Sequence, residues 1–266
     1  MSELLDLLRR HTVYDLAQPY FAGMPHFPTH PPYLFGLTRK HGDLVLEGNV
    51  SSSAESIALG GHVGTHIDAL CHFSCNGKLY GGVQASAVQS STGGFSALSV
   101  DTIQPMLRRG VLLDIAAELK MDALPADFAV TSDHLDRALK TASVAIEPGD
   151  VVLLRTGWAR FFPDAARYVT AGGHAATGPG PELEAARWLS SRGIFAAGSD
   201  TIAFEKVPAP SMPVHVHLLV DSGIHIIEAL DLEELARNRI FEFVFVAAPL
   251  KIRGGTGSPI RPLALA

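Results

Sequence analysis

Short runs of apolar residues, bounded by glycine, proline or acidic residues, predict buried strands along the second half of the chain. A continuous apolar run is typical of a strand covered on both faces, whereas a strand with one face in water alternates apolar and polar residues. A weaker strand-like pattern extends from Leu44 to Leu70. The buried strands are predicted in GVLLDI from Gly110, VVLL at 151–154, IFAAGSD at 194–200, HIIEAL at 225–230 and FEFVFVAAPL at 241–250.

Helical spacing of apolar residues, together with capping residues, predicts helices between and before these strands. The segment PELEAARWLSSRG is expected to have Pro181 in its first turn and Gly193 as its end, because proline suits the start of a helix and glycine its end. The segment TSDHLDRALKTA begins with capping residues and continues with helix formers. The predicted helices cover residues 2–10, 131–142, 181–193 and 231–236.

The order of these segments predicts one mixed α/β domain over residues 1–266, with strands outnumbering helices. No internal repeat or low-complexity linker divides the chain. The stretch from Gln18 to Tyr33 carries five prolines, which fix φ and remove backbone donors, so it is predicted to be an ordered loop. Loops of this kind often line functional sites.

The composition argues against several classes of protein. Hydrophobic residues make up 47% of the 266, which is enough for a core and argues against disorder. The formal charge of −6, from 21 basic and 27 acidic residues without a basic block, argues against nucleic acid and anionic membranes as partners. The chain lacks an apolar run of roughly 18–20 residues and a signal-peptide core, so we expect a soluble cytoplasmic protein. Its two cysteines, Cys71 and Cys75, fit a reducing compartment.

The candidate chemistry is concentrated in GGHVGTHIDALCHF, residues 60–73. His62, His66 and Asp68 occupy even positions, and alternate side chains of an extended chain share one face, so two imidazoles and a carboxylate would converge. In a helix, Asp68 would point roughly 200° away from the histidines. Gly64, on the same face, is expected to leave an opening for an ion and its waters. These ligands suit zinc, manganese or iron, and such an ion lowers the pKa of bound water from about 15.7 to roughly 7.

His72 lies off this alternation, so we assign it the role of a general acid or base in preference to that of a metal ligand. The alternative is a supporting role, in which its imidazole is hydrogen-bonded to a metal ligand. A purely structural role for the cluster is disfavoured, because three histidines and an aspartate fall within eleven positions. Phe73 and the aromatics of the proline-rich loop could stack on a flat substrate, although aromatics near a strand are more often core. His26 and His30 in that loop are weaker candidates.

A second cluster lies in PVHVHLLVDSGIHIIE, residues 213–228. His215 and His217 are predicted to share one face of a strand, and the Glu228 carboxylate would help to balance the charge of a divalent ion. These three residues form either the second half of the site, as ligands or substrate-binding groups, or a hydrogen-bond network in the core. His225 alternates with apolar neighbours and is predicted to face away, at the surface.

The string HVGTHIDALCH resembles the signature H-x-G-T-H-x-D-x-P-x-H of the cyclase family, which includes bacterial kynurenine formamidases and isatin hydrolases. The resemblance implies that His62, His66 and Asp68 are metal ligands and that His72 is the catalytic base. It also implies a swivelling β/β/α fold, a homodimer or higher assembly with sites near the subunit contact, and hydrolysis of a carbon–nitrogen bond. It extends through DLAQPYFAGMP, GDVVLLRTGW, GSDTIAFE, MPVHVHLLVDSGIHIIEALDLEEL and APLKIRGGTGSPIRP.

One departure bears on the branch of the family. Leu70 stands where the formamidase pattern has proline, and the H-x-H arrangement before Glu228 is closer to the isatin hydrolases. The resemblance therefore favours a single manganese ion and an isatin-like cyclic amide as substrate, with zinc as the alternative metal, because two zinc ions are typical of formamidases. An arylformamidase acting on an N-formylated aromatic amine is the alternative enzyme, since both reactions use hydroxide attack on a metal-polarised carbonyl.

The residues give less support to functions of other classes. A cysteine hydrolase would pair Cys71 with His72, but adjacent residues of a strand point to opposite faces. A cupin-type metal site is disfavoured because the gap from His217 to Glu228 is far too long for its pattern. A metal-binding module without catalysis stays open. The segment KIRGGTGSP lacks the GK[ST] and the strand-to-helix context of a phosphate-binding loop.

Overall fold

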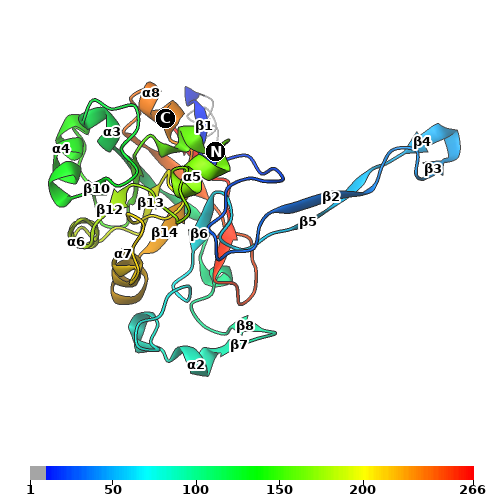
Figure 1. Ribbon diagram of the computed structural model, residues 1–266, viewed down its shortest axis with the longest axis horizontal. Helices are drawn as coiled ribbons and strands as arrows, with labels where there is room; N and C mark the ends of the chain where they lie inside the picture. The colour runs from blue at the N-terminus through cyan, green and yellow to red at the C-terminus, as the bar shows by residue number, and fades with distance from the viewer. Residues whose placement is uncertain (1–9) are drawn as a thin grey trace.

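The computed structural model describes residues 10–266, and its centre is a curled mixed sheet of nine strands (Figure 1). The strand order is β1-β17-β15-β9-β11-β13-β14-β6-β16. The strands β9, β11, β13 and β14 run parallel to one another, and the remaining pairs are antiparallel. The bounds are β1 (Val13–Asp15), β6 (His66–Asp68), β9 (Met106–Asp114), β11 (Val151–Arg155), β13 (Ala196–Ser199), β14 (His225–Glu228), β15 (Glu242–Ala247), β16 (Gly257–Pro259) and β17 (Leu263–Leu265).

The parallel strands are covered on both faces, as their continuous apolar runs predict. In β11, Val151 and Leu153 pack into one core cluster, and Val152 and Leu154 pack into the cluster on the opposite face. Helices cover that second face, and their apolar side chains, such as Leu135, belong to the same core cluster. They are α3 (Ile115–Glu118), α4 (Ser132–Ala142), α6 (Leu183–Ser190), α7 (Pro213–His215) and the π-helix Val216–Ser222 that continues it. The predicted mixed α/β class, with strands outnumbering helices, is confirmed.

Local sequence signals place most of these helices, and strand pairing moves the start of one of them. The helix predicted at 131–142 is α4, with Thr131 as its cap, and that at 231–236 is α8 (Glu233–Arg237). The helix predicted from Pro181 begins only at Leu183, because Pro181 lies in β12 (Gly180–Pro181), which pairs with β10 (Ala129–Val130). The helix predicted at 2–10 falls on residues outside the described range, apart from its last residue.

The strand predicted through His215 and His217 is wrong. Met212 caps a helix there, and Pro213 occupies its first turn. The fixed φ of proline is preorganised for that position, so the chain continues as α7 and the π-helix. In a helix, residues two apart point in different directions, and the two histidines therefore do not share a face.

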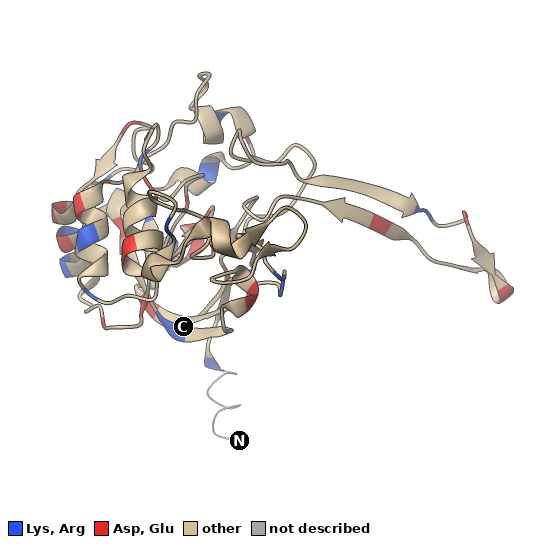
Figure 2. Ribbon diagram, turned by 90° about the horizontal axis from the view of Figure 1, so that it is seen from below, with Lys and Arg blue, Asp and Glu red and all other residues tan. Residues whose placement is uncertain are grey.

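Residues 34–58 form a two-stranded arm that projects from the body of the molecule (Figures 1 and 2). β2 (Leu34–Arg39) pairs with β5 (Ala54–Ala58), and β3 (Val45–Leu46) pairs with β4 (Val50–Ser51) at the tip. The strand-like pattern from Leu44 to Leu70 is thus divided among β3, β4, β5 and β6. The predicted loop at 18–33 contains neither helix nor strand, apart from an isolated bridge.

The remaining elements are short. They are α2 (Ala85–Val88), α5 (Ala165–Thr170), β7 (Gln89–Ser90) and β8 (Gly94–Phe95), with 3-10 turns at Glu47–Asn49, Tyr80–Gly82, Val100–Thr102 and Trp158–Phe161. Among residues 10–266, no helix combines the length and the apolar character that crossing a membrane requires.

Gly180→Ala is expected to lower the free energy of unfolding by about 1–3 kcal/mol, which is typical of an overpacked interior. A Cβ at Gly180 would overlap the backbone from Phe204 to Lys206, and backbone cannot rotate away as a flexible side chain can. Gly178→Ala is the matched control, because its Cβ would meet only a Val207 methyl group at 3.7 Å. Urea unfolding measures both variants, and equal midpoints would contradict this account of the packing.

Candidate metal centre

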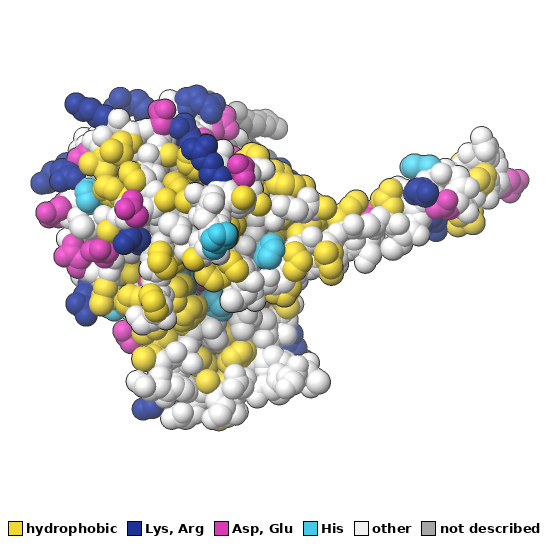
Figure 3. Space-filling view, in the orientation of Figure 1, with side chains coloured by type: hydrophobic (Ala, Val, Ile, Leu, Met, Phe, Trp, Pro, Cys, Tyr) yellow, Lys and Arg dark blue, Asp and Glu magenta, His cyan; other side chains and the backbone are white. Residues whose placement is uncertain are grey.

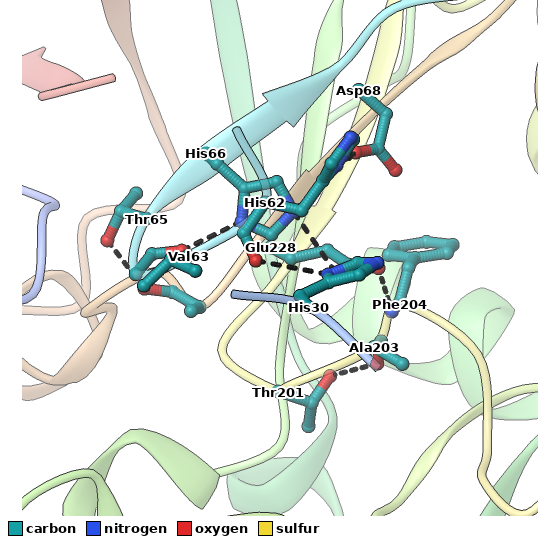
Figure 4. Close-up of polar contacts among 12 residues, drawn as sticks. His30, His62, Val63, Thr65, His66, Asp68, Thr201, Ala203, Phe204 and Glu228 are labelled. Atoms are coloured by element: carbon teal, nitrogen blue, oxygen red, sulfur yellow. Dashed lines mark hydrogen bonds and ion pairs between the residues drawn. The ribbon is translucent and has the colours of Figure 1, made fainter. Parts of the chain in front are cut away.

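The strand β6 carries His66 and Asp68 into the interior, and the turn before it brings His62 beside them (Figure 4). His62 Nδ1 lies 2.7 Å from Asp68 Oδ1, and His66 Nε2 lies 3.5 Å from the same oxygen. All three side chains are buried. β6 is hydrogen-bonded on both sides, to β14 and β16, so its backbone holds these groups in a fixed arrangement.

The opening for an ion predicted at Gly64 is wrong. Gly64 has φ +65°, so the chain is not extended there, and an added Cβ would overlap Tyr20 and Met24. The Tyr20 hydroxyl lies 2.7 Å from the Val63 carbonyl oxygen and 3.1 Å from that of Thr65. The missing side chain therefore makes room for Tyr20, which ties down the turn between the two histidines.

Hydrogen bonds at Nδ1 orient two imidazoles so that their Nε2 atoms face the carboxylates. His66 Nδ1 donates to the Gly64 carbonyl at 2.8 Å, and His215 Nδ1 donates to Glu205 Oε1 at 2.6 Å. The His66 Nε2 atom lies 3.4 Å from Glu228 Oε2, and that of His215 lies 3.1 Å from Glu228 Oε1. Acceptors at the far nitrogen are the usual support of metal-ligating histidines.

The negative charge of the cluster calls for a cation. Burial alone would raise the pKa of the Asp68 carboxyl, but the fields of His72 and His62 outweigh it and lower that pKa well below its usual range. Asp68 Oδ2 is buried without a hydrogen-bond partner among the described residues. An ionised oxygen in this state is costly unless a cation neutralises it.

The donor atoms form two groups that share Asp68. His62, Asp68 and His72 make one group, and Asp68, His215 and Glu228 make the other, with the ligand atoms of each group within 4.8 Å of one another. Imidazole and carboxylate donors fit a divalent zinc or manganese ion.

Burial lowers the pKa of His215, but its hydrogen bonds to Glu205 and Glu228 outweigh this and raise the pKa to about 10. A metal ion would therefore compete with a proton for His215 Nε2.

A pocket with a volume of about 340 Å³ opens onto these groups. His72 is half-buried in its wall, and its ring stacks on that of His62 at 3.8 Å between centroids. Burial lowers the pKa of His72 to about 3, against the opposing Asp68 carboxylate, so the imidazole is neutral at pH 7. The pocket is lined by Phe27, Thr29, His30, His62, His66, His72, Phe73, Ile202, Ala203, Ala209, Met212, His215 and Glu228.

Three of the candidate histidines lie apart from the pocket. His217 is half-buried beside the Ser190 hydroxyl at 2.8 Å, and His26 contacts the carbonyl of Phe27 at 3.1 Å.

His225 is buried, so its predicted surface position is wrong. Its Nδ1 donates to the Asp68 carbonyl at 2.9 Å, across the space between β14 and β6. The sheet is covered on both faces at this point, and neither side of β14 meets water.

Cys71 points away from His72, as expected, but both residues lie in a turn after β6 and not in the strand from which this was predicted. Its thiol packs in the core, 3.7 Å from the Gly255 carbonyl, while His72 faces the pocket. Burial raises the pKa of the Cys71 thiol to about 12. A thiolate–imidazole pair is therefore absent, which removes the basis for a cysteine hydrolase.

Sequence reasoning missed two residues of the centre. Glu205, 1% exposed, accepts hydrogen bonds from the ring and the backbone of His215. Thr256 Oγ1 lies 2.9 Å from His62 Nε2. Glu205 follows an apolar run, a weak local signal. Nothing local points to Thr256, because its contact with His62 depends on the pairing of β16 with β6.

Comparisons with known proteins agree with the fold and the donor set. The model of a family described as putative cyclase matches residues 14–206, and this chain belongs to that cyclase family. An isatin hydrolase of Roseibium aggregatum is 32% identical over 213 residues, covering 79% of this chain and 73% of the relative. A kynurenine formamidase of Bacillus thuringiensis subsp. konkukian is 23% identical over 93% of this chain and 94% of its own.

A solved structure, isatin hydrolase A from Ralstonia solanacearum, superimposes with a TM-score of 0.77 at 26% identity, covering 100% of this chain and 96% of that one. The relatives share hydrolysis and differ in substrate, as their names state. They support a hydrolase function for this chain.

The unpartnered Asp68 oxygen predicts that a divalent ion stabilises the fold. Mn²⁺ or Zn²⁺ at a hundred times its dissociation constant is expected to raise the unfolding free energy of chelator-treated protein by about 2.7 kcal/mol. Asp68→Asn should lose most of this gain, because an uncharged amide is a poorer ligand. Thermal unfolding with and without metal measures the stabilisation in both proteins. Asp127→Asn, at an exposed aspartate, is the control. An equal metal-dependent shift in wild type and Asp68→Asn would contradict the assignment.

Proposed function

We propose that this chain is a metal-dependent amidohydrolase that cleaves the carbon–nitrogen bond of an isatin-like cyclic amide. The proposal is carried by one observation, the buried donor cluster around Asp68 at the wall of a ligand-sized pocket. The isatin hydrolase relative, at 32% identity, favours the cyclic amide over other substrates. We further propose that residues 1–266 act as one domain; cytoplasmic location and a homodimer or higher assembly remain predictions from the sequence.

His62, His66 and Asp68 would hold the ion, with one Mn²⁺ favoured and Zn²⁺ as the alternative. A bound divalent ion supplies Lewis-acid activation of water and of the substrate carbonyl. His72, neutral at pH 7, takes a proton from the attacking water and returns it to the leaving nitrogen. The same imidazole therefore acts first as base and then as acid.

The aromatic wall of the pocket would position a flat substrate. Phe73 contacts the rings of His72 and His215, with centroids 4.8 and 4.9 Å away. A planar ring lying against Phe73 would present its carbonyl to the buried donors. His215 and Glu228 would then bind substrate or complete a second metal site, whereas His217 does not line the pocket and contacts Ser190 instead.

An arylformamidase is the second candidate. The donor group formed by Asp68, His215 and Glu228 does not include His62 or His72 and would accommodate a second ion, as the resemblance to formamidases implies. This observation favours a two-metal enzyme acting on an N-formylated aromatic amine. The number of ions bound per chain therefore distinguishes the two candidates.

His72→Ala is expected to reduce kcat by roughly 10²–10⁴-fold, the usual contribution of a general acid/base, while metal content is unchanged. Elemental analysis and steady-state kinetics on the same preparation measure both quantities. His217→Ala is the matched control, because His217 is a partly buried histidine outside the pocket lining. Wild-type turnover in His72→Ala would remove His72 from its role, and loss of metal would make it a ligand.

A screen with isatin and N-formylkynurenine after chelation and metal add-back tests the substrate. We expect Mn²⁺ to restore the hydrolysis of isatin, with one ion bound per chain. Hydrolysis of N-formylkynurenine with two zinc ions would support the arylformamidase instead. Metal binding without hydrolysis of any amide, lactam or lactone would favour a non-catalytic metal-binding module.

A further inference from the structure

His62 is oriented differently from the other two buried imidazoles of the metal centre. His66 and His215 each donate from Nδ1 to an acceptor and direct Nε2 toward the carboxylates. His62 instead directs Nδ1 toward Asp68 Oδ1, at 2.7 Å (Figure 4). Its Nε2 faces away from the carboxylates and lies 2.9 Å from Thr256 Oγ1. An ion held by His62 would therefore be bound through Nδ1.

The hydroxyl of Thr256 completes this orientation of the His62 ring. When Nδ1 binds an ion, the ring hydrogen stands on Nε2, and an N–H group of a buried ring needs an acceptor. Thr256 Oγ1 is the one hydrogen-bond partner of His62 Nε2 among residues 10–266. A hydroxyl can donate as well as accept, so it also suits the metal-free protein, in which Nδ1 carries the hydrogen and donates to Asp68.

The backbone of the segment 252–256 holds Thr256 in a fixed position. The Ala69 amide, directly after β6, donates to the Thr256 carbonyl at 2.9 Å. The Phe95 amide donates to the Gly254 carbonyl at 3.0 Å. The hydroxyl is therefore fixed relative to β6, the strand that carries two of the other donors.

A close contact between two glycines packs the lobe formed by residues 79–100 against this segment. A Cβ on Gly94 would overlap the Gly254 carbonyl, and a Cβ on Gly254 would overlap the Gly93 carbonyl. Residues 79–100 contain no charged residue, and Figure 3 shows the lobe at the bottom of the view mostly in yellow and white. The lobe therefore acts on the metal centre through packing and backbone hydrogen bonds rather than through its charge.

We propose that Thr256 is a positioning residue of the metal centre, whose hydroxyl holds the His62 ring with Nδ1 facing the ion. The lobe of residues 79–100 supports this role by keeping Thr256 in place. Thr256 does not line the pocket, so it acts through His62 and not through contact with a substrate. The inference rests on the proposed function only in requiring its divalent ion.

Co²⁺ binding to chelator-treated protein tests the proposal without substrate, because the visible absorption of bound Co²⁺ gives its affinity. Thr256→Val replaces the hydroxyl by a methyl group and should weaken Co²⁺ binding by roughly 10–100-fold, the usual effect of losing a supporting partner of a metal ligand. Thr256→Ser keeps the hydroxyl and should bind Co²⁺ nearly as tightly as wild type. Thr177→Val is the matched control, since Thr177 is a half-buried threonine whose hydroxyl donates to the Ala175 carbonyl, outside the pocket.

Gly94→Ala tests the support from the lobe. It should weaken Co²⁺ binding by roughly tenfold, because the added Cβ displaces the segment that carries Thr256. Gly81→Ala is the matched control in the same lobe. Its φ of +68° is as unfavourable for alanine as the +66° at Gly94, but no atom lies within 4 Å of the added Cβ. Circular dichroism verifies that each variant is folded before its affinity is measured.

Thr256→Val that binds Co²⁺ like wild type would overturn the proposal. Equal weakening in Thr256→Val and Thr256→Ser would also contradict it, because the hydroxyl would then not be the group that matters. Wild-type affinity in Gly94→Ala would remove the lobe from this role. Hydrolysis is assayed separately on the same samples. Tight Co²⁺ binding by wild type without hydrolysis counts against the proposed function alone, whereas active Thr256→Val with unchanged affinity counts against the role of Thr256 alone.

Discussion

The buried Asp68 carboxylate sets the main constraint on this molecule. One of its oxygens contacts His62 at 2.7 Å, and the other has no hydrogen-bond partner among the described residues. An ionised group in this position is tolerated only if positive charge surrounds it. The imidazoles of His66 and His72 approach it from its own segment and that of His215 from α7, and a divalent ion would complete the neutralisation.

The sheet delivers these groups through strand register. β14 and β6 pair so that Glu228 lies opposite His66, and a cross-strand pair is close enough for the two side chains to meet. On the other side of β6, Gly257 lies opposite Asp68, and a Cβ at Gly257 would overlap the His62 ring. A glycine is therefore needed there for His62 to reach Asp68.

The reactive centre and the part of the substrate wall formed by Phe27, Thr29 and His30 come from different parts of the chain. Most donors stand on or beside strands of the central sheet and His215 stands on α7, whereas His30 and its neighbours belong to the proline-rich loop that leads into the arm. Rigid strands suit a centre whose geometry must hold within a fraction of an ångström, and a loop can vary without disturbing it. This division is consistent with relatives that share hydrolysis but differ in the substrate their names give.

Local sequence by itself determined the buried strands, the helix at 131–142 and the placing of His66 and Asp68 on one face of β6, because alternation and apolar runs act over a few residues. His62 reaches them through the turn at Gly64, which the alternation did not predict. Only the tertiary structure decided which distant groups join them. It separated His215 from His217 through a helix that begins at Pro213, and it buried His225 behind β6. It also brought in Glu205, whose acceptor role follows from contacts between segments. Short-range patterns fix local conformation, whereas burial and long-range pairing depend on how the whole sheet assembles.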